Sequence, residues 1–139
     1  MRITGLYAAI AALMVVILAI RVTLRRRAVQ VGIGNGGDAV LARRIRVHAN
    51  AAEYVPLALL LLLILELNQT QPMLLHVFGC MLIVGRLLHA YGLSSSPALT
   101  PGRAVGMVLT WAVIAIMALL LIWQALVLWV LTSPSGMTE

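Results

Sequence analysis

Long apolar runs separated by short polar segments dominate this sequence. The apolar residues concentrate in four ranges, which are 3–24, 39–67, 73–91 and 103–131. A hydrocarbon core about 30 Å thick requires roughly 20 apolar residues in a helix. We therefore expect four transmembrane helices over these ranges, within one membrane domain that covers residues 1–139.

The segments between the apolar runs have the composition of loops. Residues 31–38 are rich in glycine, residues 68–72 are polar and end in proline, and residues 92–102 are rich in serine, proline and glycine. Such clusters break helices and favour turns. Asp38, which directly precedes the second apolar run, suits the N-cap of the second helix, and we expect a short polar tail over 132–139.

Composition agrees with a membrane protein and limits its partners. Of the 139 residues, 63% are hydrophobic and only 10% are charged, so the predicted fold class is an all-α membrane protein, a four-transmembrane-helix bundle. The formal net charge of +6 comes from ten arginines, with no lysine, against four acidic residues. These arginines alternate with apolar runs and do not cover a soluble face, so we do not expect nucleic-acid binding. Guanidinium groups in excess instead predict an anionic guest or contact with anionic membrane lipids.

The distribution of arginines predicts the orientation in the membrane. All of them except Arg2 lie in or beside the first and third loops. Positive loops remain on the cytoplasmic side of a membrane. We therefore expect both termini outside and the polar site toward the cytoplasm.

The first half of the second predicted helix carries a polar stripe. Arg43, Arg46, Asn50 and Glu53 are spaced i, i+3, i+7 and i+10, which places them within an arc of about 80° on an α-helix. Polar and charged side chains at membrane depth cost free energy unless they pair with other polar groups or with a ligand. The stripe therefore predicts a binding site. The alternative is an internal salt bridge from Arg46 or Arg43 to Glu53 that holds neighbouring helices in register.

Two further elements place polar residues at the same end of the bundle. Arg86 and His89 share a face near the end of the third helix, and Arg103 opens the fourth. A guanidinium group at that position can stabilise a thiolate by charge and hydrogen bonding. The tryptophans of the fourth run are expected to face lipid or the interface: Trp111, Trp123 and Trp129.

Part of the second predicted helix resembles a known family. The segment 46–56, Arg-Val-His-Ala-Asn-Ala-Ala-Glu-Tyr-Val-Pro, resembles the signature of the MAPEG family, the membrane-associated proteins in eicosanoid and glutathione metabolism. The Gly85-Arg86-x-x-His89 motif and Arg103 extend the likeness along nearly the whole chain. The resemblance, closest to small bacterial members, implies a left-handed four-helix bundle in the bacterial inner membrane. It also implies a homotrimer with glutathione bound between adjacent subunits near the cytoplasmic face.

The resemblance also implies roles for particular residues. Arginine suits the two carboxylates of glutathione, Glu53 suits its ammonium group, and Asn50 offers both a donor and an acceptor. Arg103 is the expected catalytic residue, because it would lower the pKa of the thiol and so activate the nucleophile. The residues expected to bind this co-substrate are Arg43, Arg46, Asn50, Glu53, Arg86 and His89; no metal ligand is expected.

Three positions depart from the pattern of the family. Ala104 replaces the serine that follows the arginine in prostaglandin synthase relatives, and Ala49 replaces an arginine found in some members. Leu93 stands where the family has a tyrosine, and Tyr91 lies two residues away. These changes leave the binding stripe intact.

The function that the resemblance implies is that of a glutathione transferase or peroxidase. Its partners would be glutathione, a lipophilic electrophile or lipid hydroperoxide from the bilayer, membrane lipids, and two further copies of the chain. One alternative is a small four-span exporter, in which Glu53 or Glu66 exchanges protons with a cationic drug. Another is a non-enzymatic lipid-binding or assembly protein that has the fold without turnover.

Overall fold

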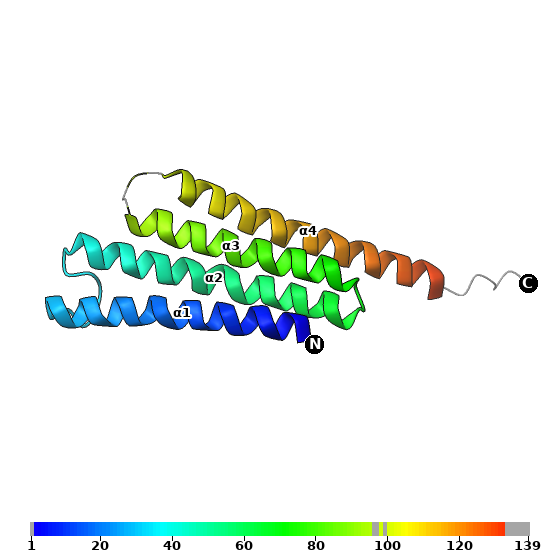
Figure 1. Ribbon diagram of the computed structural model, residues 1–139, viewed down its shortest axis with the longest axis horizontal. Coiled ribbons are helices and arrows are strands. Elements are labelled where there is room, and N and C mark those ends of the chain that lie inside the picture. The colour runs from blue at the N-terminus through cyan, green and yellow to red at the C-terminus, as the bar shows by residue number, and fades with distance from the viewer. Residues whose placement is uncertain (1, 96–97, 99, 133–139) are drawn as a thin grey trace, which may run out of the picture.

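The protein is a bundle of four long helices. The computed structural model describes residues 2–95, 98 and 100–132, and within them four helices are long and apolar enough to cross a membrane. The chain runs back and forth through the bundle, so that sequential helices lie side by side in opposite directions (Figure 1). The predicted class, an all-α four-span membrane bundle, is confirmed. The helices are α1 (Arg2–Val29), α2 (Ala39–Leu67), α3 (Pro72–Ser95) and α4 (Pro101–Thr132).

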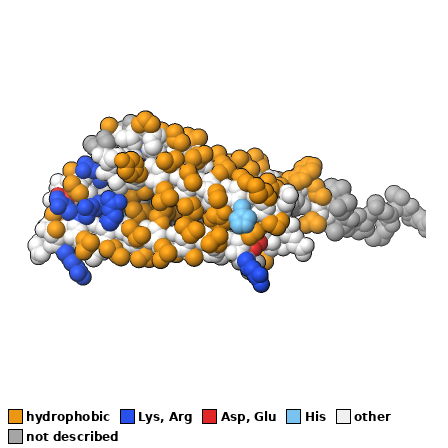
Figure 2. Space-filling view, viewed as in Figure 1, with side chains coloured by type: hydrophobic (Ala, Val, Ile, Leu, Met, Phe, Trp, Pro, Cys, Tyr) orange, Lys and Arg blue, Asp and Glu red, His pale blue; other side chains and the backbone are white. Residues whose placement is uncertain are grey.

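The two middle helices hold the bundle together. In the described part of the chain, α2 and α3 each contact all three other helices, whereas α1 and α4 do not contact each other. Hydrophobic side chains cover most of the visible surface between the two ends (Figure 2), as expected for helices in contact with lipid tails. The main buried cluster consists of Tyr7, Ala58, Leu62, Leu65, Leu75, Phe78, Leu82, Val113 and Met117.

Local sequence explains where α1 and α2 end. Asp38 caps α2 as predicted, since its side chain accepts a hydrogen bond from the backbone N–H of Leu41. Both α1 and α2 terminate at a glutamine in the left-handed conformation, Gln30 with φ 54° and Gln69 with φ 57°. At each end the following residue donates to a carbonyl five positions earlier, which is the Schellman pattern. Helix α1 thus continues to Val29, past the expected range of 3–24.

The connection between α3 and α4 is shorter than expected. Residues 92–95 belong to α3, because Gly92 there permits close approach to α4 and does not break the helix. Thr100 caps α4 by accepting from the backbone N–H of Arg103 at 3.3 Å, and Pro101 opens the helix. Residues 96, 97 and 99 of the predicted loop, and residues 133–139 of the predicted tail, lie outside the described residues.

A carboxylate and two amides fix the end of the bundle where the N-terminus lies. The two oxygens of Glu66 accept hydrogen bonds from the backbone N–H groups of Ile3 at 3.2 Å and Thr4 at 2.9 Å. Gln124 of α4 bonds Asn68 and Thr70 at the α2–α3 turn, each at 2.9 Å. The Glu66 bonds satisfy two N–H groups at the start of α1, and the Gln124 bonds tie α4 to the α2–α3 turn, so Glu66, Asn68 and Gln124 have structural roles.

Candidate functional site

A pocket lies between α2, α3 and α4, near the end of the bundle opposite the N-terminus. Its volume is about 330 Å³. We call this end of the bundle the arginine end; Figure 2 shows basic side chains gathered there. It carries Arg21, Arg25–Arg27, Arg43, Arg44, Arg46, Arg86 and Arg103. The pocket is lined by Arg46, Asn50, His89, Leu93, Arg103, Ala104, Met107, Val108 and Trp111.

Glycines bring α3 and α4 close enough to form one side of this pocket. A Cβ atom on Gly106 would lie 2.5 Å from the backbone oxygen of Gly85 and would also clash with the backbone of His89. A Cβ on Gly92 would collide with the backbone nitrogen of Arg103. Small residues at a helix crossing allow such backbone contact in membranes. The close crossing places His89 beside the start of α4.

The hydrogen bonding of His89 determines which of its ring nitrogens carries a proton. Nδ1 of His89 lies 3.1 Å from the backbone oxygen of Arg103. Because a carbonyl oxygen can only accept, Nδ1 must donate, which makes Nε2 an acceptor in the neutral ring. Nε2 is buried and has no partner among the described residues. His89 therefore offers an unused acceptor in a pocket lined by guanidinium groups.

Arg86 is buried behind Asn50. Its side chain is only 1% exposed, and its Nη2 donates to Oδ1 of Asn50 at 2.7 Å. Its guanidinium carbon lies 5.9 Å from the centre of the Tyr54 ring, within the range of a cation–π contact. In the described part of the chain, Nε and Nη1 of Arg86 have no hydrogen-bond partner. These two N–H groups can each donate to a further acceptor.

Arg46 and Glu53 form an ion pair along α2. Their side chains approach to 3.6 Å and are 64% and 51% exposed. The internal salt bridge from Arg46 to Glu53 that was the alternative interpretation of the stripe is therefore present, within one helix. Ion pairs this exposed contribute at most about 1 kcal/mol to stability, so Arg46 remains free to exchange Glu53 for another anion.

The pocket contains some of the predicted site residues and not others. Arg46, Asn50, His89 and Arg103 line it, Arg86 lies behind Asn50, and Glu53 is reached through Arg46. Half-buried Arg43 is not among the lining residues. Sequence reasoning left out the apolar wall, although residues 103, 107 and 111 recur every four positions on one helix face. The lining residues that it missed are Leu93, Ala104, Met107, Val108 and Trp111.

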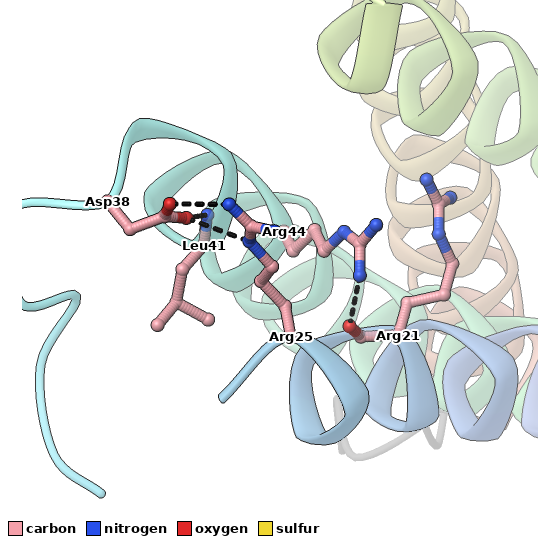
Figure 3. Close-up of polar contacts among 5 residues, drawn as sticks. All are labelled: Arg21, Arg25, Asp38, Leu41 and Arg44. Atoms are coloured by element: carbon pink, nitrogen blue, oxygen red, sulfur yellow. Dashed lines mark hydrogen bonds and ion pairs between the residues drawn. The ribbon is translucent and has the colours of Figure 1, made fainter. Parts of the chain in front are cut away.

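A second ion pair joins the helices next to the site. Arg25 of α1 contacts both carboxylate oxygens of Asp38, through Nε at 3.2 Å and Nη2 at 2.6 Å (Figure 3). Hydrogen bonding from Arg25, followed by the bond from the Leu41 backbone, lowers the pKa of Asp38 below its ordinary value. The acidic residue of the first loop is therefore already occupied and does not neutralise the pocket.

These features define a class of protein, an all-α integral membrane protein with a cationic pocket between α2, α3 and α4. The sequence model of the MAPEG family matches residues 4–123. The chain therefore belongs to the MAPEG family, as the resemblance of its signature segment indicated.

Two relatives from *Escherichia coli* resemble the chain along most of its length. The "Inner membrane protein YecN" of strain K12 is 36% identical over 121 residues, which cover 87% of this chain and 91% of that protein. The protein of the same name from strain O6:H1 has the same identity and coverage. The names of these relatives give a location in the inner membrane and no activity.

Proposed function

We propose that this protein binds glutathione in the pocket and uses its thiol against lipophilic electrophiles or lipid hydroperoxides. The observation that carries the proposal is the convergence of Arg46, His89 and Arg103 from three helices on one pocket, whose described lining residues include no carboxylate. Membership of the MAPEG family supports it. The proposed location is the bacterial inner membrane, as for the *Escherichia coli* relatives.

The donor set suits the charges of glutathione. Its two carboxylates match the guanidinium groups, which bind carboxylates in a bidentate manner. Its ammonium and peptide N–H groups need acceptors, and the unused Nε2 of His89 and the carboxylate of Glu53 can supply them. The buried Nε and Nη1 of Arg86 lie behind Asn50 and outside the pocket lining, so a bond from them to the tripeptide would require Asn50 to move aside. Arg43 remains a predicted glutathione-binding residue. Because it does not line the pocket, it would have to reach the tripeptide from outside.

Arg103 is the proposed activator of the thiol. It stands at the third position of α4, held there by the Thr100 cap, so the positive end of the helix adds to its charge. Both effects favour the thiolate over the thiol. In a transferase reaction the sulfur forms a bond to the electrophilic carbon and the leaving group departs. With a hydroperoxide, the sulfur takes the distal oxygen and an alcohol is released; a second glutathione then displaces water and gives the disulfide.

The apolar wall of the pocket offers a route for the lipophilic reactant. Val108 is 60% and Trp111 is 53% exposed on α4, and both also line the pocket. A molecule dissolved in the bilayer could therefore reach the thiol across this wall without crossing water. Assembly as a homotrimer, with glutathione between subunits, is part of the proposal.

The contacts of Glu53 and Glu66 give the exporter hypothesis less support than the pocket gives the enzyme. Both oxygens of Glu66 cap the first helix, and Glu53 pairs with Arg46 on the same helix. A proton-exchanging carboxylate has to lose such partners in each cycle. No observation favours the assembly-protein hypothesis over the enzyme.

Isothermal titration of the detergent-purified protein with glutathione at neutral pH tests the proposal. We expect saturable binding that weakens at least about tenfold in Arg46→Gln, because a charge-assisted hydrogen bond is lost. The matched control is Arg27→Gln, which removes an exposed arginine distant from the pocket and should leave the affinity unchanged. Absence of binding to the wild type, or equal effects of the two substitutions, would contradict the proposal.

The role of Arg103 needs a separate measurement. We expect Arg103→Ala to reduce the ultraviolet absorbance of bound thiolate at neutral pH, whereas Arg27→Gln retains it. Turnover with a lipophilic electrophile and with a lipid hydroperoxide then distinguishes a transferase from a peroxidase. An unchanged thiolate signal in Arg103→Ala would remove the proposed activation.

A further inference from the structure

A second cationic feature at the arginine end lies outside the pocket. Arg21 of α1, Arg44 of α2 and Ser94 of α3 surround a surface depression that is too small to hold a water molecule, so a ligand would lie over it and not in it; its other lining residues are Leu18 and Val47. Leu18 and Val47 are buried and belong to one apolar cluster. Three polar side chains from three helices thus surround an apolar floor.

Neither guanidinium group in this depression has an anionic partner in the part of the chain that the structure describes. Nη1 of Arg44 donates to the backbone oxygen of Arg21 at 2.9 Å, which holds Arg44 beside the turn that carries Arg21 (Figure 3). The side chain of Arg21 makes no hydrogen bond or ion pair with the described residues. Two like charges held close together repel each other unless an anion lies between or beside them.

The acidic residue nearest in sequence to this part of α2 is not available to them. Asp38 contacts Arg25 through both oxygens and also caps α2. The described part of α1 contains no acidic residue. The depression therefore presents two positive charges and a hydroxyl group to the outside of the bundle.

The surface of α1 next to Arg21 is apolar and faces outward. Ile10 and Ile17 lie within about 40° of Arg21 around the helix and are 40% and 58% exposed. Leu13, which is 66% exposed, adjoins them. A ligand that meets both surfaces must combine an anionic group with apolar chains running along a membrane-spanning helix.

We propose that Arg21, Arg44 and Ser94 bind the phosphate of an anionic phospholipid, whose acyl chains lie along α1. Guanidinium groups bind phosphate in a bidentate manner, and Ser94 adds a hydroxyl donor. The site is independent of glutathione, because its residues do not line the pocket between α2, α3 and α4.

Native mass spectrometry of the detergent-purified protein tests the site. The probes are phosphatidylglycerol and phosphatidylcholine with identical acyl chains. We expect the wild type to retain phosphatidylglycerol in preference to phosphatidylcholine. Arg21→Gln should weaken phosphatidylglycerol binding about fivefold, in keeping with one arginine near an anionic headgroup, and should weaken phosphatidylcholine binding less, because the choline cation already offsets the charge of its phosphate.

Arg27→Gln is the matched control, since Arg27 is also an exposed arginine of α1 and its removal changes the net charge equally. It should change phosphatidylglycerol binding less than twofold. The Arg21 side chain has no partner among residues 2–95, 98 and 100–132, so folding should survive its substitution. Equal retention of the two lipids by the wild type, or equal effects of Arg21→Gln and Arg27→Gln, would overturn the proposal.

One competition experiment and one comparison of ligands identify the occupant. Inorganic phosphate at the same concentration as the lipid should not displace phosphatidylglycerol, because it lacks the chains that α1 contacts. Displacement by phosphate would overturn the lipid assignment. So would weakened glutathione binding in Arg21→Gln with unchanged lipid binding, which would transfer Arg21 to the glutathione site.

Discussion

Arg86 is a buried cation whose hydrogen bonding links the core of the bundle to the pocket. A buried guanidinium group requires hydrogen-bond partners, and among the described residues Arg86 has only the Asn50 oxygen and the Tyr54 ring. Asn50 also lines the pocket. One amide therefore connects the stability of the bundle with the shape of the binding surface.

Substitution of Asn50 should expose this dependence. Asn50→Ala leaves the buried Nη2 of Arg86 without an acceptor, which should lower the free energy of unfolding by roughly 1–3 kcal/mol. Asn50→Asp keeps an acceptor and supplies a counter-charge, so it should retain most of the stability. Thermal unfolding in detergent, followed by circular dichroism, measures both variants. Equal losses in the two variants would show that this hydrogen bond does not stabilise the fold.

At the scale of single residues, the sequence could predict which side chains share a helix face but not which residues of other helices they contact. Helical periodicity placed Arg46 and Asn50 on one stripe, and both line the pocket. The same periodicity included Arg43, which lies outside the lining, because an arc of a helix faces several neighbours whose positions depend on packing. The Arg86–Asn50 bond joins residues 36 positions apart, and no local pattern predicts such a pair.

At the scale of elements, the crossing of α3 and α4 determines where His89 and Arg103 meet. Gly106→Ala should force the backbones apart, because its Cβ would collide with the backbone of His89. We expect a loss of roughly 1–3 kcal/mol in stability, as for overpacked cores, together with weaker glutathione binding. Unfolding and titration measurements on the same preparation would detect both effects.

The matched control is Gly5→Ala in α1, where a Cβ atom would meet nothing within 4 Å. Alanine favours a helix over glycine by up to about 1 kcal/mol, so this variant should be unchanged or slightly more stable. If Gly106→Ala behaves like Gly5→Ala, then the close crossing does not position the site.

The cap of α2 should make stability depend on pH. The pKa of Asp38 is lowered in the folded protein, so its contribution is complete above the ordinary value of about 3.9. The contribution is lost as the pH falls through the lower, folded-state pKa. We expect wild-type protein to be more stable than Asp38→Asn at neutral pH, with the difference shrinking in acid.

Unfolding midpoints of both proteins measured from pH 7 to pH 3 would test this sign. The same substitution in an Arg25→Gln background should have a smaller effect at neutral pH, because the ion pair is already absent. A difference between wild type and Asp38→Asn that persists unchanged in acid would exclude the ion pair as its cause.

Helix ends were less predictable from sequence than helix existence. Apolar length alone indicated four helices, because a bilayer imposes a minimum span. The end of α1 after Val29 is set by Gln30, which adopts a left-handed conformation that is more typical of glycine. Gly92 signalled a turn in the sequence, yet it serves as a contact point with α4. Composition cannot distinguish these two uses of glycine.

At the scale of the whole molecule, the arginine end should face the cytoplasm. The positive-inside rule predicts this orientation from the arginine-rich loops. In a Cys80→Ser background, Ile33→Cys places a thiol in the first loop at a position that is 95% exposed. Gln71→Cys places one in the turn at the opposite end. A membrane-impermeant maleimide should label Gln71→Cys in intact cells and Ile33→Cys only after lysis; the reverse pattern would invert the topology.

The proposed function depends on glutathione occupying the pocket between α2, α3 and α4. The most direct measurement is an experimental structure of the protein in lipid with saturating glutathione. We predict density for the tripeptide in contact with Arg46, His89 and Arg103. Density for glutathione at another surface, or a pocket that holds none at saturation, would contradict the central claim.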